Sequence, residues 1–83
     1  MRNDKKNLIT EKVVEFSVNL LKYCELLEAN KKLVIARQLL RAGTSIGANV
    51  YEAQNAESKM DFVHKMKIAA KEASETRYWM IIC

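Results

Sequence analysis

This chain of 83 residues has few of the residues that interrupt regular structure: it contains no proline and two glycines, Gly43 and Gly47. Proline and glycine mark turns and breaks more strongly than any other residues. Where they are missing, the ends of secondary-structure elements must be inferred from apolar periodicity and from capping residues.

Cysteine is also scarce. Cys24 and Cys83 lack CxxC spacing, which argues against a disulfide framework and against a metal site. We therefore expect a reduced, cytoplasmic protein without a cofactor. Because a chain this short buries a modest share of its surface, we expect one domain over 1–83 that is stabilised by homo-oligomerisation.

Long apolar runs are missing too. No stretch of about 18 apolar residues occurs, so we predict no transmembrane helix and no membrane partner. Residues 1–7 are polar, and no signal-peptide pattern follows them. Gly43 and Gly47 have the spacing of a membrane-helix dimer motif, but charged residues flank them on the same predicted helix, which argues against that interpretation.

The charge is mildly basic, with a formal net charge of +4. Residues 1–30 carry five basic and five acidic groups, residues 31–57 carry four and two, and residues 58–83 carry five and three. The excess therefore lies in the second and third segments. It allows an anionic partner such as nucleic acid but is also compatible with an ordinary solvated surface.

Apolar residues recur with helical spacing in three stretches, which predicts helices over about 8–29, 33–55 and 58–83 after a polar arm at 1–7. Asn30 is expected to take the left-handed conformation in the first link. Ser58, with Asp61 three residues later, is typical of a helix N-terminus. The pattern predicts an all-α, antiparallel up-down helix bundle.

The second predicted helix has a wide apolar arc, which is typical of a central helix with neighbours on two sides. Gly43 and Gly47 form part of a small-residue seam on which another backbone can approach closely. The third predicted helix has two apolar stripes. The stripe with Phe62 and Met80 is expected to pack inside the protomer, and the one with Ile68 and Trp79 to need another helix or subunit.

Several polar and apolar residues together form a recognisable motif: Gln38, Arg41, Ser45, Ile46, Asn49, Glu52, Ser58, Phe62, Ile68, Ala69, Glu72 and Glu75. Over residues 10–83 the chain resembles the small bacterial four-helix-bundle proteins encoded within intervening sequences of 23S rRNA genes. The resemblance implies a homopentameric ring with no enzymatic activity. A related protein, the accessory variability protein of diversity-generating retroelements, binds nucleic acid and a reverse transcriptase. By resemblance, a fourth helix is expected beyond the third; the sequence ends at Cys83 within the third predicted helix, and we expect the fourth place to belong either to a longer chain or to another subunit.

Two functions remain open: binding of structured RNA or DNA through its backbone, and a protein-interaction scaffold without nucleic acid. A nucleic-acid-processing protein is a further candidate partner. No aromatic platform interleaved with the cations is evident, which favours backbone contacts over base contacts. The candidate phosphate-binding residues are Arg37, Arg41, Lys65, Lys67 and Lys71.

The remaining polar residues favour structure over catalysis. Glu72 and Glu75 could perform acid–base chemistry or hold a metal, but the Glu-x-x-His pairs of a di-metal bundle site are missing. Ser45 lacks an evident base, because His64 lies on another predicted helix. We therefore predict no enzyme, no catalytic residue and no metal ligand. The predicted interface or structural residues are Gly43, Ser45, Gly47, Asn49, Glu52, Glu72, Glu75 and Trp79.

Overall fold

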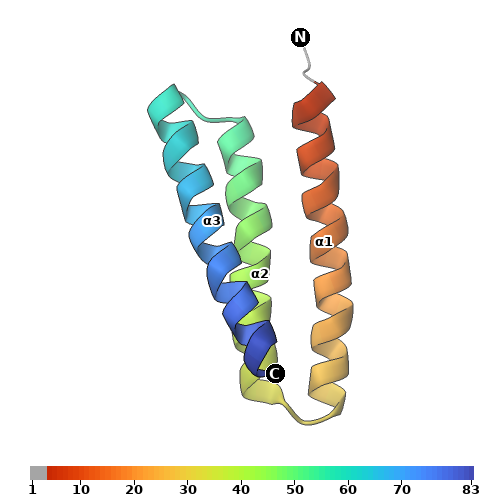
Figure 1. Cartoon of the computed structure of the whole chain (residues 1–83). Helices are drawn as coiled ribbons and strands as arrows, with labels where there is room; N and C mark the ends of the chain where they lie inside the picture. Colours follow the sequence, from red (N-terminus) through yellow and green to blue (C-terminus); the bar gives the residue numbers. More distant parts are fainter. Residues whose placement is uncertain (1–3) are drawn as a thin grey trace.

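The computed structural model describes the backbone of residues 4–83 and the side chains from residue 8 onward. It contains three α-helices: α1 (Asp4–Ala29), α2 (Leu33–Gln54) and α3 (Lys59–Ile82). They run antiparallel in sequence order (Figure 1), and α2 packs against both of the others. Residues 4–83 include no strand, so the prediction of an all-α protein with three helices is confirmed. No described helix is both long and apolar enough to cross a membrane.

The helix ends differ from the expected ranges mainly near the N-terminus. The sequence predicts a polar arm over residues 1–7, but α1 already begins at Asp4, and residues 1–3 lie outside the described part of the chain. Lysine is a good helix former, and residues 4–7 contain no glycine or proline to stop a helix. The other helix ends lie within one residue of the expected positions.

The link from α1 to α2 is a tight helix-terminating turn. Lys31 has a φ of 65°, and the N–H of Lys32 donates to the carbonyl of Leu27 at 2.9 Å, as in a Schellman motif. The sequence predicts the left-handed conformation at Asn30, but the residue that adopts it is Lys31. Asn30 instead uses its side-chain amide, which donates to the Leu26 carbonyl at 2.9 Å.

The start of α3 is capped as predicted. Ser58 has an extended backbone, and its hydroxyl oxygen accepts a hydrogen bond from the N–H of Asp61 at 3.0 Å. This bond satisfies one of the free amide groups in the first turn. The carboxylate of Asp61 also lies in that turn, where the helix dipole favours negative charge.

The core lies chiefly between α1 and α2. The buried cluster there combines larger side chains from α1 with a small residue and one fully buried leucine from α2: Leu20, Cys24, Leu27, Ala36 and Leu39. Burial raises the pKa of the Cys24 thiol, because the thiolate would lose its hydration in this apolar setting.

The glycines of α2 allow the close approach to α1. A Cβ atom at Gly43 would overlap the Leu20 side chain, and one at Gly47 would lie 2.8 Å from Val13 Cγ1. The predicted small-residue seam therefore faces α1 of the same chain. Each mid-helix glycine costs roughly 1 kcal/mol relative to alanine, and the close contact offsets that cost.

The face of α3 that meets α2 differs in part from the expected one. Phe62 and Met80, expected inside, remain 40% and 49% exposed, whereas Ala69 and Thr76 of the same stripe are buried. Trp79, expected to need another helix or subunit, is half-buried and packs on the core cluster, which residues of α1 and α2 form. The contact of α3 with α2 is thus centred between the two predicted stripes.

The end of α3 approaches α1. Tyr23 Oη and Cys83 Sγ lie 3.0 Å apart, within the distance accepted for a hydrogen bond to sulfur. This contact and the nearby thiols raise the pKa of Tyr23, because they disfavour a phenolate at this position.

Candidate nucleic-acid interface

The five cations predicted to contact phosphate lie on α2 and α3. Arg37 and Arg41 are exposed on α2, Lys67 and Lys71 are exposed on α3, and Lys65 is half-buried. At about 100° per residue, Arg41 is on the opposite side of α2 from the glycines that meet α1. Arg41 therefore lies on the side of α2 that faces away from α1, whereas Lys67 and Lys71 lie on the side of α3 opposite the buried Ala69 and Thr76.

Arg41 is occupied by a network that joins α2 to α3. Its Nη2 donates to Glu75 Oε2, and its Nη1 lies 3.5 Å from Glu72 Oε1. Glu75 Oε2 also accepts a hydrogen bond from Trp79 Nε1 at 2.9 Å. Arg41 therefore pairs with two carboxylates of α3.

Glu72 is the less satisfied of the two carboxylates. Its Oε1 atom is buried and accepts no hydrogen bond from the described residues, although Arg41 Nη1 at 3.5 Å supplies an opposite charge. Buried carboxylate oxygens normally have a donor. Among the described residues, the ion pair with Arg41 therefore offsets the cost of burying this charged oxygen.

Lys65 is also paired. Its Nζ donates to Glu52 Oε1 at 2.7 Å, which connects α3 to α2 again. The hydrogen bond and the charge of Glu52 raise the pKa of Lys65, because the carboxylate stabilises the ammonium form. Glu52, Glu72 and Glu75, predicted as structural, thus all lie at the α2–α3 contact and pair with cations from the predicted nucleic-acid set.

The other three predicted cations are available. Arg37, Lys67 and Lys71 are exposed, and no hydrogen bond or ion pair joins them to another described residue. The structure thus divides the predicted set into two cations that bridge helices and three that face solvent alone.

Ser45 and Asn49 interact with each other. The Asn49 side-chain amide donates to the Ser45 carbonyl at 2.9 Å and to Ser45 Oγ at 3.2 Å. The sequence places both among the predicted interface or structural residues, and their hydrogen bonds to each other lie within α2. They satisfy polar groups that are half-buried on the helix surface.

The groups weighed for catalysis do not form a metal cluster in the described part of the chain, where no three histidine, cysteine or acidic side chains come together. His64 is exposed on α3, while Glu72 turns toward Arg41. The carboxylates Glu52, Glu72 and Glu75 instead pair with cations across the α2–α3 contact.

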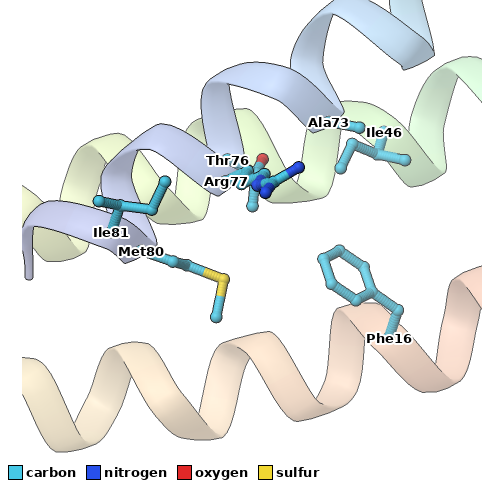
Figure 2. Close-up of a pocket in the computed structure, with 7 residues that line it drawn as sticks. All are labelled: Phe16, Ile46, Ala73, Thr76, Arg77, Met80 and Ile81. Carbon is cyan, nitrogen blue, oxygen red and sulfur yellow. The ribbon is translucent and has the colours of Figure 1, made fainter.

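An apolar groove lies between α1 and α3, over α2 (Figure 2). It encloses about 470 Å³, and the picture shows Phe16 pointing into it from α1 while Met80 points toward α1 from α3. Its residues are Phe16, Ile46, Ala73, Thr76, Arg77, Met80 and Ile81.

The sequence did not identify this groove. The one sequence signal for the groove was the apolar stripe through Phe62, Ala73 and Met80. Periodicity alone does not say whether such a stripe packs against another helix of the chain or stays exposed. Several of its apolar side chains remain about half exposed, including Met80 at 49% and Ile81 at 71%.

Comparison with known proteins agrees with the resemblance drawn from the motif. A family model described as "23S rRNA-intervening sequence protein" matches residues 5–83. A crystal structure of a protein of unknown function from the S23 ribosomal protein family of Bacteroides thetaiotaomicron is similar over 94% of this chain and 70% of that one, with 44% identity and a TM-score of 0.89. No curated protein matches the chain.

Proposed function

The chain belongs to the 23S rRNA-intervening sequence protein family, and on this premise we propose that it is a non-enzymatic, cytoplasmic homo-oligomer that binds the backbone of structured RNA or DNA. The observation that carries the proposal is the pair Lys67 and Lys71, exposed on α3 without a carboxylate partner among the described residues. Lysines of this kind can replace the counterions of phosphate groups and thereby gain affinity.

The paired cations have a supporting role in this proposal. Arg41 and Lys65 stabilise the α2–α3 contact through Glu75 and Glu52, so their release to phosphate would cost those interactions. Arg37 adds a third unpaired charge on α2. Binding therefore depends first on Lys67 and Lys71, with Arg37 contributing and the paired cations contributing less.

Oligomerisation is part of the proposal because of the apolar surface that one chain leaves open. Val14, Val18 and Leu21 lie on one face of α1 and are 46%, 44% and 46% exposed, in addition to the open groove. Large exposed apolar patches mark interaction sites. Association would cover them and would repeat Lys67 and Lys71 around the assembly, which strengthens the field that attracts phosphate. The resemblance suggests a pentamer and a bundle of four helices.

The test is fluorescence anisotropy with labelled structured RNA and duplex DNA over a salt series, on protein whose oligomeric mass has been measured by light scattering. The Lys67→Ala/Lys71→Ala protein is compared with Lys12→Ala/Lys22→Ala, which removes the same charge from exposed positions on α1. We expect affinity that falls with salt, and a slope of log K against log salt that is smaller by roughly 1.5 in the α3 double variant.

Two results would contradict the proposal: no nucleic-acid binding by a correctly assembled protein, or equal losses of affinity in the two double variants.

The second candidate function is a protein-interaction scaffold, which the apolar groove of Figure 2 favours. It would gain support if the assembled protein bound no nucleic acid while Met80→Glu, within the groove, changed its oligomeric mass.

A further inference from the structure

The outer surface of α3 carries a continuous stripe of exposed side chains at spacings of four and three residues. Such spacing keeps residues on one face of an α-helix, within an arc of about 80°. All members are exposed, and none is acidic. We call it the α3 outer stripe: Met60, His64, Lys67, Lys71, Ser74 and Tyr78.

Lys67 and Lys71 lie one turn apart in the middle of this stripe, so their Cα atoms are separated by about 6 Å along the axis. The nearest carboxylates of α3, Glu72 and Glu75, turn toward Arg41. Nothing acidic on the stripe therefore competes with phosphate for the two lysines.

Tyr78 lies farther along the same stripe and is 56% exposed. Its position is about 10 Å beyond Lys71 along the helix axis. The ring meets Trp79 edge-on, with centroids 5.3 Å apart and planes at 68°. Trp79 is in turn held by its hydrogen bond to Glu75. The tyrosine ring is thus held by its contact with Trp79, while more than half of its surface stays exposed.

We infer that Tyr78 is a stacking platform for an unpaired base of a nucleic acid whose backbone follows Lys67 and Lys71. An aromatic face at the end of a cationic track is the arrangement by which proteins hold single-stranded segments, because any base can stack on it while the cations hold the phosphates. Proteins that recognise RNA through its bases likewise target unpaired loops and bulges, whose bases are free to stack on aromatic side chains.

This inference rests on the proposed function and adds the kind of nucleic acid: a structured RNA or DNA that exposes an unpaired base beside its backbone. It also revises one expectation. The sequence shows no aromatic residue interleaved among the cations, but the helical register of α3 places Tyr78 in line with them.

The experiment compares two labelled RNAs of equal length and charge, a hairpin with an unpaired loop and a fully paired duplex, by anisotropy at one salt concentration. The variants are Tyr78→Ala, Tyr78→Phe and the control Tyr51→Ala, which removes a tyrosine of similar exposure, 49%, from α2. Circular dichroism and light scattering establish that each variant is folded and assembled.

We expect Tyr78→Ala to weaken hairpin binding by about 5- to 100-fold, to leave duplex binding unchanged, and to leave the salt slope of the hairpin as in the wild type. Tyr78→Phe keeps the ring and should bind as the wild type does, as should Tyr51→Ala.

Three outcomes would overturn the inference. If Tyr78→Ala binds the hairpin normally while Lys67→Ala/Lys71→Ala loses it, stacking is wrong and the proposed function stands. If Tyr78→Phe is as weak as Tyr78→Ala, the hydroxyl rather than the ring makes the contact. If the assembled wild-type protein binds neither RNA, both the inference and RNA binding as the function fail.

Discussion

Where α2 meets α1, glycine and alanine lie against leucine and valine, and no ion pair joins the described residues of the two helices. Where α2 meets α3, by contrast, Arg41 and Lys65 pair with carboxylates across the contact. The same helix therefore uses apolar fit on one side and charge pairing on the other. Burial of a leucine contributes about 2 kcal/mol, whereas an exposed ion pair contributes at most about 1 kcal/mol. The comparison teaches that a buried leucine between α1 and α2 stabilises the fold more than an ion pair between α2 and α3 does. The α2–α3 contact also buries Ala69 and Thr76, and its ion pairs set how α3 is rotated.

Leu39→Ala should give the largest effect. Leu39 is fully buried within the cluster between α1 and α2, so truncation loses apolar burial and leaves a cavity. We expect the free energy of unfolding to fall by about 2–5 kcal/mol, measured by urea denaturation at a fixed protein concentration because association contributes to stability. A loss below about 1 kcal/mol would show that this buried leucine contributes no more than an exposed ion pair.

Gly43→Val should come next. Any Cβ at this position overlaps Leu20, so α1 must move or Leu20 must change its rotamer. Overpacking of this kind costs about 1–3 kcal/mol. Ala48→Val is the matched control, since Ala48 is exposed on the same helix. Equal stabilities of the two variants would refute the close approach of α1 and α2.

Arg41→Met tests the ion pairs between α2 and α3. The change leaves Glu72 and Glu75 one turn apart without their cation. We expect a loss of roughly 1 kcal/mol at low salt, which shrinks in 1 M NaCl as the charges are screened. Arg37→Met removes an unpaired arginine and should change stability by less than about 0.5 kcal/mol. If Arg41→Met lowers the free energy of unfolding as much as Leu39→Ala does, the expectation that the buried leucine outweighs the ion pair is wrong.

Lys65→Met should give the smallest effect, and its cost should disappear at alkaline pH, where the wild-type lysine also loses its charge. Glu52 raises the pKa of Lys65 in the folded protein. The ion pair therefore contributes fully to the free energy of unfolding at pH values below the pKa of an unfolded lysine, about 10.4. It is lost as the pH rises through the raised value. Wild-type stability should therefore fall more steeply than that of Lys65→Met between about pH 10 and 12. Lys67→Met, which keeps the Lys65–Glu52 pair, should follow the wild type.

Much of the fold was predictable from local patterns. The spacing of apolar residues located the three helices, and Ser58 located the start of α3. The small-residue seam at Gly43 and Gly47 predicted a close backbone approach, which α1 provides. The motif also predicted the family that the comparisons then showed.

The candidate site was predictable only as a set of charges. Five cations were correctly expected on the second and third helices, but their pairing was not specified, because a carboxylate partner can come from the same helix, another helix or solvent. Contacts across α2 and α3 engage Arg41 and Lys65 and leave Lys67 and Lys71 unpaired within the described chain.

By itself, the sequence determined where the helices lie, how α3 is capped and which residues share each helical face, because these depend on neighbours within a few positions along the chain. The tertiary structure alone decided how far α3 is turned about its axis. That rotation buries Thr76, half-buries Trp79 and opens the groove at Met80. It depends on the sum of ion pairs and apolar contacts between residues more than thirty positions apart, such as Arg41 and Glu75, which no local pattern specifies.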